Sequence, residues 1–274
     1  MEIKLIEYKE RSQFQDRIAA LEKISTYPLG DDFFQIDHGD DYFAFFDRLG
    51  DVNYYVAIIN TELVAVGAGI LQSIADRHND PGKLSWYLCD LKVHPMYQNY
   101  RISVRLLEFA ITQNIQKCDR GYLISMNPGD GSPNRLVKML TRFPIVSLHL
   151  ATQLNIYSIN IQEMQFLEPL LIKHRGPLGY RSLSGIKDLR LMSTGKKFPL
   201  IHLQWGDRIE QEATADLATI GYLSTKITYM FCAPATDELT KELSERGILP
   251  TATASIMSHG MESCNWRAIT TSDI

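Results

Sequence analysis

The stretch SWYLCDLKVHPMYQNYRISVRLL (85–107) decides the fold of this chain. It opens with a nearly continuous apolar run, passes through a short polar loop and ends in apolar residues at helical spacing. This order predicts a buried strand over 84–93, then a loop, then a helix from Ser103 to about Lys117. The loop N–H groups and the helix N-terminus would face one place, and such a place binds phosphate.

Strands and helices alternate on both sides of this stretch. Upstream, two apolar runs separated by a short turn predict a β-hairpin in which Gly67 marks a bulge or a close ligand approach. Downstream, a strand, a short helix and a long strand are predicted. The ranges are 54–60 with 63–74 for the hairpin, then 121–127, 134–143 and 147–161. The fold class is therefore α/β (α+β), a mixed sheet flanked by helices.

The C-terminal part repeats this order of elements. We expect strands at 199–205, 227–232 and 249–257, and helices at about 208–220 and 236–247. The repeated elements lie about 105 residues after their counterparts. The sequence predicts two domains, 1–162 and 163–274, and the second is either a partial, degenerate copy of the first or an α/β extension that completes its sheet.

Composition narrows the class of protein. The chain has 274 residues, of which 45% are hydrophobic, and its net charge of -4 gives no support for nucleic-acid binding. The N-terminus lacks a signal peptide, and no run approaches the roughly 18 apolar residues of a membrane span. Four cysteines and seven histidines show no metal-ligand spacing, and unpaired cysteines fit a reducing compartment. We expect a soluble cytoplasmic protein that binds no metal, nucleic acid or membrane.

The stretch 84–107 resembles the acyl-CoA-binding core of the GCN5-related N-acetyltransferases (GNATs). The family signature is Arg or Gln, two variable residues, Gly, one variable residue, then Gly or Ala, and QNYRIS (98–103) stands at this place. Arg101 replaces the glycine and Ser103 replaces the last small residue. The flanking residues match the usual spacing, and they are Leu91, Val93, Pro95, Tyr97, Leu106 and Leu107. The pattern of Tyr87, Leu88 and Asp90 is similar to the same strand in polyamine-type members.

The resemblance implies acetyl-CoA or another acyl-CoA as the co-substrate. It places the cofactor on Leu91, Val93, Gln98, Asn99, Tyr100, Arg101, Ile102, Ser103 and Val104. Arg101 does not freely adopt the positive φ that glycine allows, although its guanidinium can contact phosphate. Ser103 still supplies a backbone N–H, and its hydroxyl is expected to cap the helix. The resemblance also implies that strands 84–93 and 121–127 run parallel and splay.

The resemblance implies a catalytic base on the strand before the loop, where Asp90 is the only carboxylate. Because side chains alternate along a strand, Asp90 and Cys89 are expected to face opposite sides. Asn134 matches the family's characteristic Asn, and the resemblance implies a catalytic role for it. Thr141 stands where relatives carry the Tyr that acts as general acid. Three alternatives follow: another tyrosine, such as Tyr87, protonates the leaving thiolate, water protonates it, or acetyl transfer does not occur.

Three functions remain open. The first is an N-acyltransferase that moves an acyl group from acyl-CoA to the amine of a small molecule. The second is an N-acyl amino acid or acyl-homoserine-lactone type synthase that uses an acyl carrier protein (ACP), since a Phe-rich segment (33–46) suits a long acyl chain. The third is a catalytically inactive ligand-binding or regulatory protein. A homodimer is a further open partner assignment.

Overall fold

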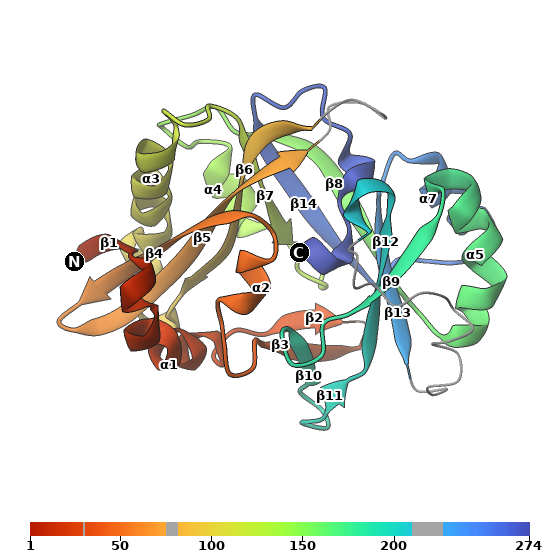
Figure 1. Ribbon diagram of the computed structural model, residues 1–274, viewed down its shortest axis with the longest axis horizontal. Coiled ribbons are helices and arrows are strands. Elements are labelled where there is room, and N and C mark those ends of the chain that lie inside the picture. Colours follow the sequence, from red (N-terminus) through yellow and green to blue (C-terminus); the bar gives the residue numbers. More distant parts are fainter. Residues whose placement is uncertain (30, 75–81, 210–226) are drawn as a thin grey trace.

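The computed structural model of the chain describes residues 1–29, 31–74, 82–209 and 227–274. One ten-stranded mixed sheet runs through the molecule in the order β1-β4-β5-β6-β7-β14-β8-β13-β12-β9 (Figure 1). Its strands are β1 (Glu2–Ile6), β4 (Asp51–Ile59), β5 (Glu62–Ile74), β6 (Lys83–Val93), β7 (Gly121–Met126), β14 (Ala252–His259), β8 (His149–Ile159), β13 (Thr228–Pro234), β12 (Leu200–Trp205) and β9 (Leu178–Ser182).

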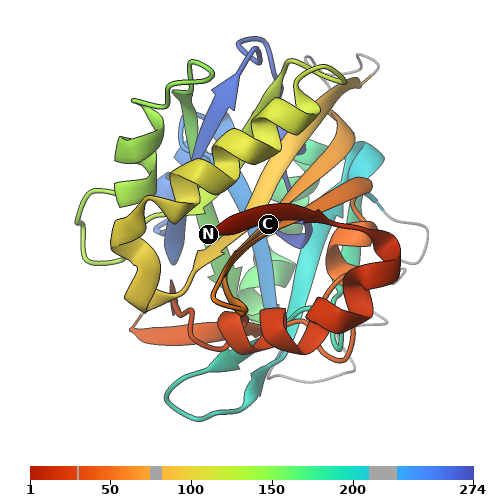
Figure 2. The ribbon, with the colours of Figure 1, turned by 90° about the vertical axis from the view of Figure 1, so that its left-hand side faces the viewer.

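Helices cover both faces of this sheet, as predicted. They are α1 (Arg11–Glu22), α2 (Ala44–Asp47), α3 (Ile102–Asn114), α4 (Arg135–Leu140), α5 (Ile161–Arg175) and α7 (Glu238–Glu245). Figure 2 shows α3 lying across the strands of the first half. Its buried Ile102, Leu106 and Ala110 pack on one face of β4 and β5, whereas Ile18 and Leu21 of α1 join the core on the other face.

A second, smaller sheet joins the first half of the chain to the second. It has the order β11-β10-β3-β2 and contains β2 (Tyr27–Leu29), β3 (Asp32–Asp37), β10 (Asp188–Leu191) and β11 (Lys197–Phe198). Strand β3 pairs with β10 across about 150 residues of sequence, and Asp37 forms an ion pair with Arg190 at 2.8 Å. More than half of the acidic segment 31–41 thus belongs to β3.

The predicted hairpin is confirmed as β4 and β5. Its two-residue turn consists of Asn60 and Thr61, whose φ values are 47° and 71°. Two consecutive residues with positive φ are the geometry of a type I′ turn, which matches the twist of the flanking strands.

The sheet is nearly symmetric about its β14–β8 pair. On one side of this pair the next strands in the sheet are β7, β6 and β5. On the other side they are β13, β12 and β9. Strands β6 and β7 are parallel, and so are β12 and β13. The repeated element order predicted from the sequence is therefore present in β13, α7 and β14. The predicted helix at 208–220 falls mostly outside the described residues, as does most of the polar loop at 75–83.

The last strand of each half crosses over to the other half. Strand β8 follows α4 in sequence but pairs with β13, and β14 follows α7 but pairs with β7. The predicted division between residues 162 and 163 lies in the first turn of α5, and the main sheet continues across it. Each half therefore needs a strand from the other to complete its sheet.

Candidate active site

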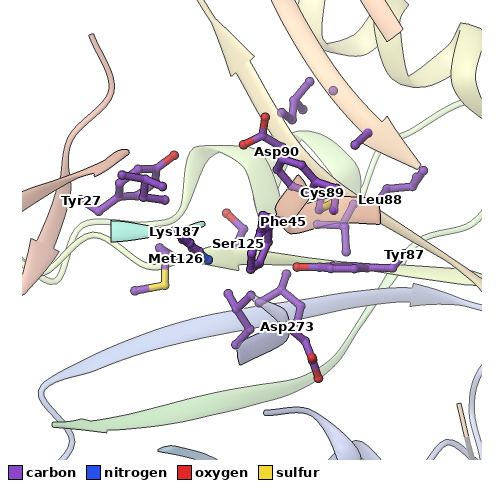
Figure 3. Close-up of a pocket in the computed structure, with 18 of the residues that line it drawn as sticks. Tyr27, Phe45, Tyr87, Leu88, Cys89, Asp90, Ser125, Met126, Lys187 and Asp273 are labelled. Carbon is purple, nitrogen blue, oxygen red and sulfur yellow. The ribbon is translucent and has the colours of Figure 1, made fainter. Parts of the chain in front are cut away.

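A cavity opens where two parallel strands separate. Strands β6 and β7 pair only from Trp86 to Leu88 and from Gly121 to Leu123, after which β7 continues beside β14. The predicted splay of these strands is confirmed. Residues 88–91 and 123–126 from the two diverging strands line a cavity of about 230 Å³ (Figure 3).

A β-bulge in β6 turns additional side chains toward this cavity. Val66 pairs with Lys92 and Ala68 with Cys89, so two residues of β6, Asp90 and Leu91, lie opposite one residue of β5. Asp90 has a φ of 53°, the left-handed conformation found in some bulges. Cys89 and Asp90 both line the cavity. The expected alternation of these two side chains is wrong, because the bulge interrupts the pleat.

Asp90 belongs to a buried polar network that connects three segments. Its carboxylate accepts hydrogen bonds from the Lys92 ammonium and from the Tyr42 hydroxyl. Lys92 also donates to Glu22 of α1 at 3.0 Å, and His38 Nδ1 lies 2.7 Å from the same Glu22 oxygen. The His38 Nε2 atom is buried and has no hydrogen-bond partner among the described residues. The network holds Asp90 in place at the edge of the cavity.

The charges in this network shift each other's protonation. Burial raises the pKa of Asp90, and the nearby charge of Glu22 raises it further against the opposing effect of Lys92. Burial alone would lower the pKa of Lys92, but the charges of Asp90, Tyr27 and Glu22 and the hydrogen bond to Asp90 together outweigh it, so this pKa is also raised. Two carboxylates thus share one ammonium, which makes Asp90 the more basic carboxylate and a suitable proton acceptor.

Two further groups beside Asp90 keep their protons. Burial raises the pKa of Cys89 to about 12, so this cysteine is a neutral thiol packed in the cavity wall. Tyr87 is 3% exposed and stacks on Tyr122 with ring centres 4.8 Å apart. Burial holds the pKa of Tyr87 well above its usual value. Tyr87 can therefore donate a hydrogen bond into the cavity but does not ionise.

The loop before α3 keeps the backbone geometry of a glycine. Arg101 has φ 56° and ψ 26°, and it stands at the N-cap of α3 without a side-chain cap. Arg101 thus adopts a positive φ although a residue with a Cβ atom does not do so freely. The predicted cap by Ser103 is wrong, because its hydroxyl lies 3.7 Å from the Met139 sulfur. The first N–H groups of α3 are consequently not covered by a capping side chain.

The other predicted cofactor residues separate into two groups. Gln98, Tyr100 and Arg101 are exposed in or next to the turn η2 (Pro95–Tyr100), and Asn99 belongs to the same turn. Ile102 and Val104 are buried, and Val93 packs against the hydrophobic cluster that α3 forms with β4 and β5. These side chains therefore support the loop from the core rather than facing the cofactor. Leu91 lines the cavity directly.

Asn134 holds α4 against the end of β7. Its Oδ1 accepts hydrogen bonds from the N–H groups of Leu136 and Val137 at 3.1 and 3.2 Å. Its Nδ2 donates to Ser125 Oγ, the Met126 carbonyl and Asn127 Oδ1, each at 3.1 Å. These contacts use the hydrogen-bonding capacity of the amide, and Asn134 is not among the cavity-lining residues.

The second half supplies the opposite wall of the cavity, which the sequence did not indicate. Lys187, His202 and Asp273 reach it from segments far from β6, and Phe45 reaches it from α2 (Figure 3). His202 is 4% exposed, and burial lowers its pKa to about 3, so its ring is neutral. No local motif surrounds these residues, and only the long-range strand pairing brings them to the site.

The equivalent separation between β12 and β13 is filled by protein. These strands pair over Leu200 to His202 and then diverge. Thr271, in the short turn η5 (Thr271–Asp273), lies 3.0 Å from His202 Nδ1 and donates to the Met230 carbonyl at 3.0 Å. A buried segment of the chain therefore occupies the second slot, and the first slot is the one that remains open.

Neither a membrane-crossing helix nor a metal cluster is found in the part of the chain that the structure describes. No described helix has both the length and the apolar character of a span. Histidine, cysteine and acidic side chains do not gather in threes there in a way that would hold a metal ion.

No family model matches the sequence. A relative, the uncharacterized protein L340 of Acanthamoeba polyphaga mimivirus, is 24% identical over 243 residues, which cover 86% of this chain and 68% of that protein. A probable N-acyltransferase from Enterococcus faecalis matches 96% of this chain and 73% of its own at 11% identity, with a TM-score of 0.47.

A tandem GNAT protein from the clavulanic acid biosynthesis pathway has a TM-score of 0.55. At 10% identity, the match covers 94% of this chain and 98% of that one. This similarity extends over both halves, in agreement with the near-symmetric sheet. The chain therefore shares the fold of this tandem GNAT protein over both of its halves.

Proposed function

We propose that the protein is an N-acyltransferase that moves an acyl group from acyl-CoA to the amine of a small molecule. The observation that carries this proposal is the open slot between β6 and β7, which begins beside the bulge at Asp90. A linear acyl-pantetheine arm needs such an opening, because its amides would otherwise lack partners in the sheet. Bound acyl-CoA would supply the thioester as acyl donor.

The loop from Gln98 to Ser103 supports binding of the CoA pyrophosphate. The N-terminus of α3 has no capping side chain, and Arg101 holds the turn in the left-handed conformation. Backbone N–H groups at a helix N-terminus attract phosphate, and the exposed Arg101 guanidinium adds a positive charge beside them. The residues present therefore fit a phosphate group although the family glycine is replaced.

Asp90 is the proposed general base. It is the carboxylate at the mouth of the slot, and its raised pKa favours uptake of a proton from an ammonium substrate. Tyr87 is proposed to donate a hydrogen bond to the leaving sulfur. Because a thiol is a far stronger acid than this buried phenol, Tyr87 keeps its proton and the sulfur leaves as a thiolate, while the proton of the ammonium goes to Asp90.

The cavity wall favours an acyl group or acceptor with an apolar body. Phe34, Phe45 and Phe46 line the cavity from the N-terminal segment, and Ile156 and Met230 line it from the far side. This lining also favours the second candidate, a synthase that receives a long acyl chain from an ACP. Release of the free thiol from acetyl-CoA, octanoyl-CoA and octanoyl-ACP, each with a panel of amines, separates the two candidates.

A titration with CoA and acyl-CoA tests the proposal directly. Ligand at 100 times its Kd stabilises a folded protein by about 2.7 kcal/mol, which thermal unfolding detects. We expect stabilisation by acetyl-CoA that is lost in Arg101→Glu and kept in Asp90→Asn, with turnover lost in Asp90→Asn. Absence of a shift with CoA, acetyl-CoA and octanoyl-CoA would remove the CoA-dependent function. Binding with no turnover for any amine would favour an inactive, ligand-binding protein.

A further inference from the structure

Lys187 is a cation in the cavity wall, and no acidic side chain among the described residues pairs with it. It lies between β9 and β10 and lines the cavity from the second half of the chain. Its Nζ atom is 4.4 Å from the centre of the Phe45 ring, and Figure 3 shows its nitrogen turned toward that ring. Within the described ranges, this ammonium has no hydrogen-bond or ion-pair partner.

The charged groups around Lys187 do not neutralise it. Arg48 and Lys92 are both positive and oppose its charge, while the Asp90 carboxylate is already bonded to Lys92 and Tyr42. Near the C-terminus, the carboxylate of Asp273 accepts a hydrogen bond from the Thr270 hydroxyl at 3.1 Å. Burial, reinforced by Arg48 and Lys92, lowers the pKa of Lys187 to about 8. At neutral pH most molecules therefore carry an ammonium in this largely apolar cavity.

An unpaired charge in apolar surroundings is unfavourable unless something else supplies its counter-charge. The carboxylates of Asp90 and Glu22 do not supply this counter-charge to Lys187, because both already accept hydrogen bonds from the Lys92 ammonium. The cavity is open beside Lys187, and its other walls are mainly apolar. The missing negative charge is therefore expected to come from a molecule that enters the cavity.

We propose that Lys187 binds a carboxylate of the acceptor substrate, so that the acceptor is an amine with an apolar body and an acidic group. This inference rests on the proposed function for the amine, but the carboxylate subsite is a property of the free protein. Asp90 from the first half would then meet the amine, and Lys187 from the second half would hold the acid. The two halves of the chain would thus bind opposite ends of one substrate.

Three small probes with the same six-carbon body test this subsite without acyl-CoA. They are hexanoate, hexanamide and hexylammonium, titrated into the full chain by calorimetry and thermal unfolding at pH 7. Hydrogen bonds to charged groups are strong enough that hexanoate is expected to bind at least about tenfold tighter than the other two. Equal binding of hexanoate and hexanamide by the wild-type protein, or no binding of hexanoate, overturns the proposal.

Variants at Lys187 show whether the preference comes from this side chain. In Lys187→Met and in Lys187→Gln the preference for hexanoate is expected to disappear, whereas Lys173→Met, an exposed lysine on α5, keeps it. A preference that persists in either Lys187 variant that folds overturns the assignment.

The pH dependence gives an independent readout. Hexanoate stays ionised from pH 7 to 9.5, so its affinity for the wild-type protein should fall as Lys187 loses its proton near pH 8. Cys89 and Lys92, which face the same region, keep their protons over this range, and the Arg48 guanidinium stays charged. An affinity that does not change with pH contradicts the proposal. Acetyl-CoA titrated into the same samples tests the proposed function separately. If either the carboxylate subsite or acyl-CoA binding fails its test, the result for the other still stands.

Discussion

At Arg101 a long, charged residue occupies a backbone conformation that glycine adopts most easily. The left-handed region costs a residue with a Cβ atom roughly 1–2 kcal/mol. The buried Ile102 and Leu106 anchor the start of α3 against the sheet, and η2 leads into it from β6. The packing of α3, rather than the preference of Arg101, therefore sets the turn.

Replacement of Arg101 by glycine is expected to stabilise the fold by up to about 1 kcal/mol, because glycine has no Cβ atom to strain at φ 56°. Urea unfolding measures the change. The matched control is Ser103→Gly two residues later, at a right-handed helical position, which should lose roughly 0.5–1 kcal/mol. Losses of equal size at both positions would contradict the left-handed geometry of residue 101.

Lys187→Met is expected to stabilise the free protein at pH 7. The folded-state pKa of Lys187 is about 8, below its usual 10.5. Between these two values the unfolded chain holds more protons, so this residue makes stability rise with pH there, and below pH 8 its full cost remains. That cost is on the order of 3 kcal/mol at most. The advantage of the variant over wild type should shrink between pH 8 and 10.5, and a constant difference would contradict the burial of this charge.

Some residues of the candidate site could be predicted from the sequence and others could not. Asp90, Tyr87 and Leu91 follow from a local pattern, since they stand on the strand before a recognisable loop. Lys187 and His38 come from segments without such a pattern, and they reach the cavity only through the pairing of β3 with β10 and the packing of α1. The direction in which Asp90 points also depended on a bulge, which a strict two-residue period does not predict.

At the scale of elements, the N-cap residue of the short helix α4 connects this helix to the site. Asn134 caps α4 and also donates to the end of β7, where Ser125 and Met126 line the cavity. Its position in the family pattern suggested a catalytic role, which stays a prediction. Its contacts support a role in positioning β7.

Asn134→Ala is expected to lower stability by about 2 kcal/mol, because it removes an N-cap and leaves polar groups of β7 without their donor. Asn134→Asp keeps the capping oxygen and should lose less. The exposed N-cap of α5, Asn160→Ala, is the control and should cost about 1 kcal/mol. Urea unfolding measures stability, and turnover per folded molecule tests catalysis. Normal stability with abolished turnover would instead assign Asn134 to the reaction.

The elements that were predicted correctly are those with strong local signals. The β4–β5 hairpin has a clear turn, β6 and α3 show a change of period, and α7 has a capping Asp237 and ends before Gly247. Helix α5 was missed, since the preceding strand was extended to residue 161. Its capping box of Asn160 and Glu163 was a usable signal, but Pro169 inside the helix weakens the pattern.

At the scale of the whole molecule, the exchange of β8 and β14 makes the two halves interdependent. An edge strand left without its partner exposes unpaired N–H and C=O groups. Without β14, strand β7 would have such an edge, and β13 would have one without β8. No local pattern in the sequence predicts this exchange, because each strand would satisfy its hydrophobic faces equally well beside its sequence neighbour.

The two halves are expected to unfold together. Trp86 in β6 and Trp205 in β12 are both buried, and they report on different halves. Variants that retain only one of them, with phenylalanine at the other tryptophans, should show the same urea midpoint by fluorescence after correction for any shared loss of stability. Transitions that separate, with one half melting first, would instead support independent domains at the predicted 162/163 division.

The exchange of strands also affects how the chain folds as it is synthesised. Strand β7 ends at Met126, but its partner β14 is complete only at His259. At 5–20 residues per second, the ribosome needs on the order of ten seconds to make the intervening chain. During that time the first half has an incomplete sheet and a cavity without its far wall. We therefore expect the β14 side of β7 to stay without its final partner in the nascent protein until the last strand has been made.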